Sequence, residues 1–100
     1  MILDNSNHLD AMRKKSLEMQ NKLADILATG KAGIGDYLVE VELNGKHEAT
    51  KVTINPVLTK ENPEAIGDLV AAAITDATHH LEEKIKLELV KLFQNNSQTS

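Results

Sequence analysis

Four basic side chains near the start of the chain have the spacing and type to bind a polyanion: Arg13, Lys14, Lys15 and Lys22. Lys15 and Lys22 are seven residues apart and would share one face of a helix, whereas Arg13 and Lys14 fall on other flanks. Flexible cations placed in this way can contact phosphate groups without reading a base sequence. The same residues would also suit the solvated flank of a packed helix, so both interpretations remain open at this point.

Two neighbouring histidines, His79 and His80, form the second group that could do chemistry. Adjacent helix residues point about 100° apart, so the two rings cannot hold one metal ion together. Four-residue spacings to Asp76 and Glu83 would give only two ligands each, which is too few for a structural metal site. The pair is either an ordinary surface feature or a source of positive charge that appears as the pH falls toward 6. We expect no bound metal and no cofactor.

No combination of side chains predicts a catalytic centre. Thr75 and Asp76 are consecutive, so on a helix they face different ways. Gly30, Gly33 and Gly35 do not form a phosphate loop, because a strand follows them instead of preceding them and no Gly-Lys-Ser/Thr is present. We expect no catalytic residues, no small-molecule substrate and a protein that is not an enzyme.

Length and composition restrict the fold class further. One hundred residues make one domain of marginal stability, and with no cysteine neither disulfides nor zinc–thiolate sites can stabilise it. A second copy of the chain is the remaining source of stability. Neither a secretion signal nor an apolar run of ~20 residues is present, so we expect a cytoplasmic protein without a membrane partner.

The charge is negative overall and unevenly distributed. The net charge is −4, which argues against a protein that coats nucleic acid with its whole surface. From residue 61 onward, seven acidic residues stand against three lysines, whereas the earlier parts of the chain are balanced. An anion-binding surface must therefore be local, and the best candidate is the segment that carries Arg13 to Lys22.

The elements that position these residues follow from periodicity. His8–Ala28 predicts a helix with Asn7 as its cap, ended by Gly30, and Gly30–Gly35 predicts a flexible connector. The helix is amphipathic, because apolar residues recur at spacings of three and four with Ser16 filling the one gap. Those apolar residues are Leu9, Met12, Met19, Leu23 and Ile26.

Alternating hydrophobicity predicts strands in the middle of the chain. Tyr37–Leu43 alternates strictly, and Asn44-Gly45 then predicts a hairpin. The return segment, Lys46–Ile54, is either one bent strand or two short ones, and Asn55-Pro56 ends it. A sheet this small has exposed edges and is marginal alone, which again favours a dimer.

A second, longer helix closes the domain. Asn62 is its predicted cap, with Pro63 at the first helical position. An apolar stripe then runs from Ile66 to Leu92, long enough that the far end must project or pair. We place the domain at residues 1–94 and expect 95–100 to be a disordered polar tail.

Several segments, in order along nearly the whole chain, carry a family resemblance. They are the lysine-bearing first helix, Gly30–Gly35, Val39–His47, Val52–Leu58 and the stretch Asp68–Ala77, which reads DLVAAAITDA. Together they resemble the YbaB/EbfC family of bacterial nucleoid-associated proteins. The chain differs from the family pattern in an apparent insertion at Asp36-Tyr37, in His79-His80 where basic residues are common, and in its acidic second helix.

The resemblance implies an α+β fold: an αβββα subunit whose small antiparallel sheet lies between an N-terminal and a long C-terminal helix. It also implies a tight homodimer with projecting helices, a place in the nucleoid, and binding to duplex DNA with little sequence preference and no catalysis. The expected DNA-binding residues are Arg13, Lys14, Lys15, Lys22, His79 and His80. The alternative is a dimeric protein-interaction adaptor on the same fold, in which the acidic surface has weakened or replaced DNA binding.

Overall fold

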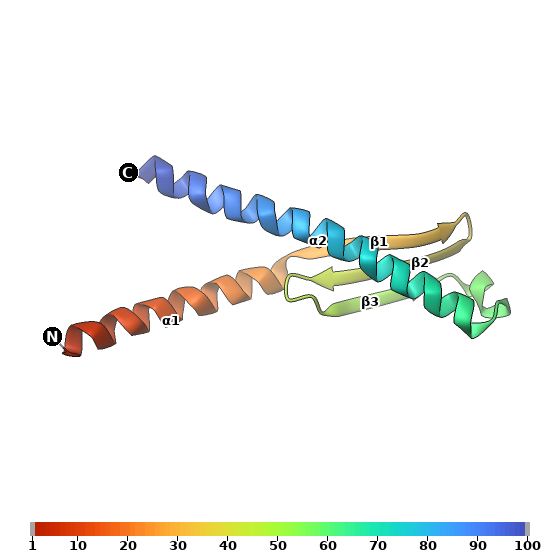
Figure 1. Cartoon of the computed structure of the whole chain (residues 1–100), viewed down its shortest axis with the longest axis horizontal. Coiled ribbons are helices and arrows are strands. Elements are labelled where there is room, and N and C mark those ends of the chain that lie inside the picture. Colours follow the sequence, from red (N-terminus) through yellow and green to blue (C-terminus); the bar gives the residue numbers. More distant parts are fainter. Residues whose placement is uncertain (1, 100) are drawn as a thin grey trace.

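The computed structural model describes the backbone of residues 2–99 and the side chains of residues 9–91 and 94. Two helices and a three-stranded antiparallel sheet make up the chain, with β2 in the centre of the sheet (Figure 1). This confirms the expected α+β fold and its αβββα order. The elements are α1 (Ile2–Asp25), β1 (Leu27–Ile34), β2 (Tyr37–Asn44), β3 (Ala49–Ile54), the 3-10 helix η1 (Pro56–Lys60) and α2 (Pro63–Thr99).

Strand β1 occupies residues for which the sequence predicts the end of a helix and a flexible connector, and that prediction is wrong. The first helix ends at Asp25, and β1 pairs with β2 from Leu27 to Ile34. Gly30 explains the error, because it serves close packing instead of flexibility. A Cβ at Gly30 would lie 2.1 Å from the backbone nitrogen of Ala77, so only glycine lets α2 approach this strand so closely.

The beginning of α1 also differs from the sequence prediction. The helix starts at Ile2, so Asn7 lies inside it instead of capping it. No glycine or proline occurs before Gly30, and nothing in the sequence therefore stops the helix from extending toward the N-terminus.

The Asn44-Gly45 hairpin is confirmed, but its turn is longer than two residues. The backbone N–H of Asn44 donates to the carbonyl of Glu48 at 2.9 Å, and His47 takes the positive φ of 65°. Gly45 does not have a positive φ, and it is needed instead where the turn meets α1: a Cβ there would lie 2.0 Å from the carbonyl oxygen of Leu23. The return segment is one strand, β3, with a register irregularity at Glu42/Leu43.

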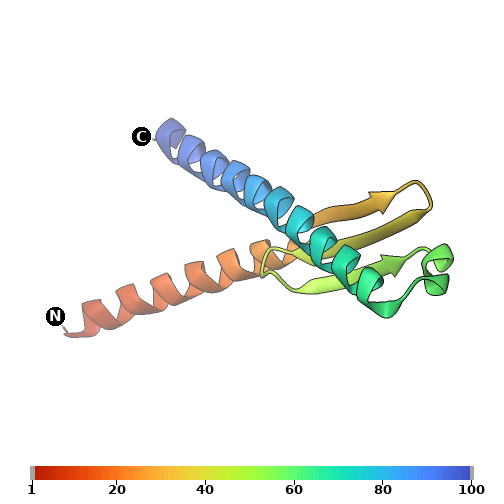
Figure 2. The same ribbon diagram turned by 45° about the vertical axis from the view of Figure 1, so that its right-hand side comes forward.

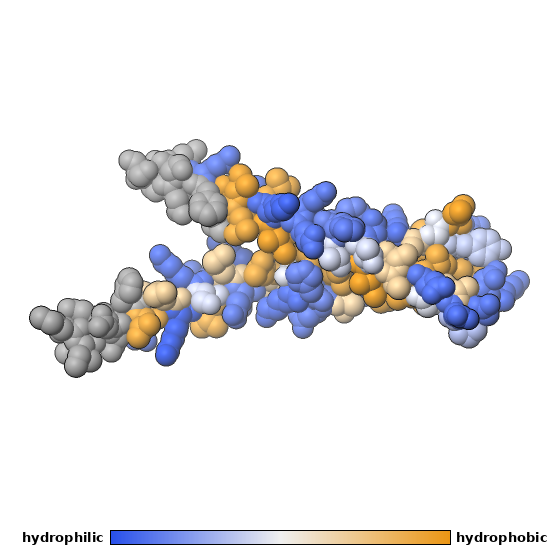
Figure 3. Space-filling model, viewed as in Figure 1, coloured by the Kyte–Doolittle hydropathy of each residue, from blue (hydrophilic) through white to orange (hydrophobic). Residues whose placement is uncertain are grey.

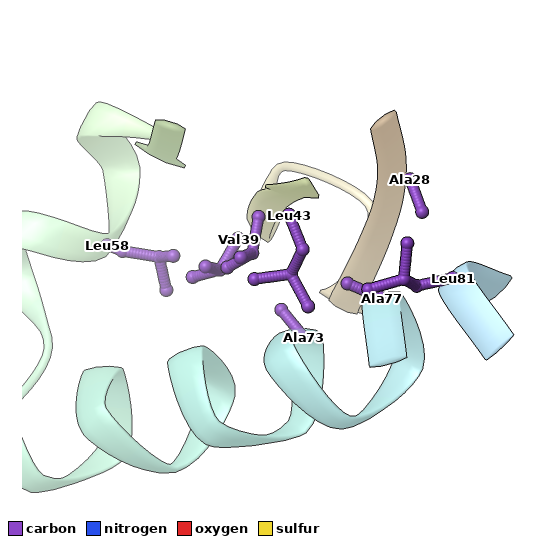
Figure 4. Packing of buried hydrophobic residues seen from close by; sticks show 8 residues of the cluster. Ala28, Val39, Leu43, Leu58, Ala73, Ala77 and Leu81 are labelled. Carbon is purple, nitrogen blue, oxygen red and sulfur yellow. The ribbon is translucent and has the colours of Figure 1, made fainter. Parts of the chain in front are cut away.

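The core lies between α2 and the β1–β2 half of the sheet (Figure 4). As predicted, α2 begins behind Asn62, whose side-chain oxygen accepts the N–H of Ala65 at 2.7 Å. Two small residues of α2, Ala73 and Ala77, allow the close contact with Gly30 of β1. The buried set is Ala28, Val39, Val41, Leu43, Leu58, Ala73, Ala77 and Leu81.

Two parts of the apolar surface stay uncovered. Figures 1 and 2 show α2 running across one face of the sheet, and its contacts there are with β1 and β2. Val52 and Ile54 of β3 share this face with Val41 and Val39 but are 47% and 39% exposed. The second uncovered part is α1, which extends away from the sheet and gives the molecule a length of 67 Å.

The C-terminal half of α2 also projects beyond the sheet, as the length of its apolar stripe predicts (Figure 1). The helix continues to Thr99, through residues for which the sequence predicts a disordered tail. No glycine or proline interrupts the chain after Gly67, so no residue ends the helix earlier. Ser100 lies outside the described residues.

Candidate nucleic-acid interface

The four predicted cations all lie on the projecting part of α1. Each of the four is exposed, and none forms an ion pair with a carboxylate of the described residues. Successive helix residues are turned by about 100°, so Lys15 and Lys22 lie within about 20° of each other on one flank of the apolar stripe. Arg13 lies on the opposite flank, and Lys14 on the side away from the stripe. The α1 arm therefore presents free positive charge in several directions.

The projecting part of α2 has less free positive charge. The ammonium group of Lys84 donates to the backbone carbonyl of Leu27, and Lys91 Nζ lies 3.5 Å from Glu88 Oε1. Two further glutamates, Glu82 and Glu83, are exposed on the same arm. Of the two arms, α1 is therefore the better surface for a polyanion.

The two predicted histidines are in different surroundings. His80 Nδ1 lies 2.7 Å from the backbone oxygen of Thr29, and its Nε2 lies 3.8 Å from Asp76 Oδ1. His79 is exposed on the outer side of α2. His80 thus has a structural partner in β1 that the sequence did not predict, and only His79 points fully away from the fold.

His80 belongs to a row of polar side chains that covers the free edge of β1. Asp76, His80 and Lys84 are spaced four residues apart on α2. The N–H of Lys31 donates to Asp76 Oδ2 at 2.9 Å, while His80 and Lys84 meet the carbonyls of Thr29 and Leu27. An open edge strand offers such groups to other chains. These three side chains, here called the edge ladder, occupy them.

Sequence reasoning missed the edge ladder because it missed β1. The sequence did contain a signal: polar residues spaced four apart lie directly beside the apolar stripe of α2. Side chains in that position of a helix can reach the sheet that the helix covers.

An apolar groove lies where the two arms diverge. It has a volume of about 280 Å³, and Figure 3 shows hydrophobic side chains in this region. Met19, Leu23 and Ile26 line it from the α1 side, and Ile85 and Leu89 from α2. Three charged residues, Lys22, Asp25 and Glu88, complete its lining.

Two further observations concern the described residues. Among them, no three side chains of metal-ligating type lie together. Within the same part of the chain, neither helix combines the length and the apolar character that crossing a bilayer requires.

Comparison with known proteins gives consistent matches. The model of the YbaB/EbfC DNA-binding family matches residues 3–96. Nucleoid-associated proteins of Legionella pneumophila strains Corby and Paris are each 35% identical over 81 residues, which cover 81% of this chain and 70% of each relative. Among solved structures, an uncharacterized protein of Helicobacter pylori superposes with a TM-score of 0.66 at 27% identity, covering 88% of this chain and 91% of the other.

Proposed function

The chain belongs to the YbaB/EbfC DNA-binding family, and from this premise we propose that it is a nucleoid-associated homodimer that binds the phosphates of duplex DNA with little sequence specificity. The observation that carries the proposal is the α1 arm, with its four exposed cations and no carboxylate of the described residues paired to them. Lysine and arginine on a projecting helix can reach phosphates without deforming the sheet or the core.

Low specificity follows from the kind of contact that this surface offers. Phosphate contacts orient a protein on DNA but carry no direct sequence information. The chain has only two aromatic residues, Tyr37 and Phe93, so stacking on unpaired bases is not supported. The bound form is therefore duplex DNA, and affinity should depend strongly on salt.

The homodimer is proposed from the apolar surface that one chain leaves uncovered. On α1, Leu9 and Met12 are 53% and 57% exposed, and a helix gains most of its stability by packing such a stripe. The groove between the arms and the exposed Val52 and Ile54 of β3 are further apolar regions that one chain leaves uncovered. An apolar surface of this extent in a small protein marks an interface, and a second copy would bury it.

A second candidate, a protein-interaction adaptor on the same fold, is favoured by the charge of α2. Its projecting part carries three glutamates, and two of its lysines already have partners. An acidic arm repels DNA and would suit a basic protein partner. The two candidates share the dimer and differ only in what the arms bind.

The experiment compares two variants that lose the same charge. The first removes the α1 cations (R13A/K14A/K15A/K22A), and the matched control removes four exposed lysines of the body (K31A/K46A/K51A/K60A). Fluorescence anisotropy of a labelled duplex of about 30 base pairs should show lost binding for the first variant and retained binding for the second. Equal weakening of both would mean that only net charge matters and would contradict the α1 interface.

The dimer has its own test. Sedimentation velocity of the wild-type chain should give twice the 11.0 kDa chain mass. Val52→Asp places a charge in the proposed interface and should shift the protein toward the monomer, whereas Thr53→Asp on the opposite face of β3 should not. A monomeric wild-type protein at micromolar concentration would overturn this part of the proposal.

A further inference from the structure

The hairpin between β2 and β3 contains the asparagine–glycine pair Asn44-Gly45, which packs against the C-terminal end of α1. Asn44 is only 8% exposed, and its Oδ1 accepts the backbone N–H groups of Lys46 and Glu48 at 2.9 and 3.1 Å. Its Nδ2 donates to Glu48 Oε1 at 2.9 Å. The backbone N–H of Gly45 donates to the carbonyl of Leu23 at 2.9 Å. Figures 1 and 2 show this turn beside the end of α1.

Asparagine followed by glycine is chemically reactive, because no side chain shields the glycine nitrogen from the asparagine side chain. The nitrogen of Gly45, after losing its proton, can attack Cγ of Asn44. Ammonia leaves as the new C–N bond closes a five-membered imide ring. Water then opens the ring at either carbonyl, which leaves aspartate or isoaspartate at position 44. Water is the only co-reactant that the step requires.

The fold blocks this reaction at both reacting groups. Attack requires that the Gly45 nitrogen has no hydrogen-bond partner and that the Asn44 side chain rotates until its Cγ comes within bonding reach of that nitrogen. The nitrogen is bound to Leu23 of α1, and three hydrogen bonds fix the Asn44 amide. If the last turn of α1 moves away, the nitrogen is released. We propose that Asn44 is a latent deamidation site that the docked end of α1 protects.

The product would not fit the turn that the amide built. A carboxylate at position 44 has no N–H to donate to Glu48, and two carboxylates would then face each other at hydrogen-bond distance. The modified turn would bind the end of α1 less well. The reaction would therefore prolong the loss of the hydrogen bond between Gly45 and Leu23. Because α1 carries the proposed DNA-binding cations, the consequence for DNA rests on the proposed function, but the deamidation itself does not.

The first test measures deamidation of the full chain by mass spectrometry of the peptide that contains Asn44. In native buffer at pH 8, the reaction should be at least tenfold slower than in urea that unfolds the protein. The exchange of the Gly45 amide hydrogen should accelerate over the same urea range as deamidation. Equal deamidation rates in native buffer and in urea, or deamidation that rises while the Gly45 amide stays protected, would overturn the proposal.

Two proline variants locate the protection. Ala24→Pro forces Leu23 out of the helical conformation and so displaces its carbonyl, whereas Ala11→Pro breaks α1 far from the turn. With circular dichroism confirming that the sheet is retained, Ala24→Pro should deamidate at least tenfold faster than wild type and Ala11→Pro at the wild-type rate. A folded Ala24→Pro that deamidates as slowly as wild type would refute protection by α1.

A second pair of variants tests the product. Asn44→Asp should lower the melting temperature by about 5 °C, because it removes a hydrogen bond and opposes two charges. Adding Glu48→Gln restores a donor opposite the new carboxylate and should recover most of the loss. An unchanged melting temperature for Asn44→Asp would contradict the proposed effect on the turn.

Discussion

The flank of α1 that carries Lys15 and Lys22 should dominate the salt dependence of DNA binding. The two residues are separated by about 10 Å along the helix and by about 20° around it, so one DNA strand can meet both. Arg13 lies about 160° away from Lys15. A dimer would thus place four cations of this flank on phosphates, which gives a slope of log K against log salt of about −3.6.

The matching perturbation is Lys15→Ala/Lys22→Ala. With a slope of −3.6, four phosphate contacts raise the binding constant by about three and a half orders of magnitude between 1 M and 0.1 M salt. The variant should lose most of that gain and show a slope near zero. The control, Arg13→Ala/Lys14→Ala, removes the same charge and should keep a slope near −3.6. Alanine favours the helix, so neither variant should disturb α1.

The assay is fluorescence anisotropy of a labelled duplex titrated at several salt concentrations between 50 and 200 mM. Over this range the wild-type affinity should fall about 150-fold. Identical slopes for the two double variants would refute the assignment of the phosphate contacts to one flank of α1.

Three further predictions concern the close packing of β1, its covered edge and the histidines. Gly30→Ala should destabilise the fold by about 1–3 kcal/mol in urea unfolding, because its Cβ would overlap the α2 backbone. Gly67→Ala, in open space on α2, should be neutral or stabilising by up to about 1 kcal/mol, and an equal loss for both would argue against the close contact. Removing the edge ladder (D76A/H80A/K84A) should expose the edge of β1 and cause association beyond the wild-type size in sedimentation. The charge-matched control H79A/E83A/K86A should keep the wild-type size. The same size for both variants would show that the ladder does not prevent pairing at β1. DNA affinity should rise as the pH falls from about 7.5 to 6, because an imidazolium group adds positive charge. The same rise in H79A/H80A, which keeps His8 and His47, would exclude His79 and His80 as its source.

The sequence predicted a residue's structural role correctly where neighbouring residues determine that role, and not where a distant part of the chain determines it. The Asn62 cap, the stop at Asn55-Pro56 and the alternation of β2 are local signals, and the structure has all three. The role of Gly30 is set by Ala73 and Ala77 of α2, which are more than forty residues away in sequence, so its local pattern suggested a connector. Gly45 does mark a hairpin, as its local pattern predicts. The reason that only glycine fits there is its contact with Leu23 of α1, which the local pattern does not contain.

The candidate site shows the same division. The exposure of Lys15 and Lys22 follows from helical periodicity, and the structure has both on the free flank of α1. The position of His80 does not follow from the sequence, because its partner Thr29 belongs to the strand that the local pattern concealed. Which surfaces a second copy would cover likewise depends on contacts between chains, which no periodicity within one chain encodes.

The most direct test of the central claim is the titration of wild-type protein into duplex DNA from low to physiological salt. We expect micromolar or tighter binding at low salt, a log–log slope near −3.6, and similar affinity for unrelated duplex sequences. No binding at low salt by a protein that sediments as a dimer would contradict the DNA-binding account and leave the adaptor as the function of this fold.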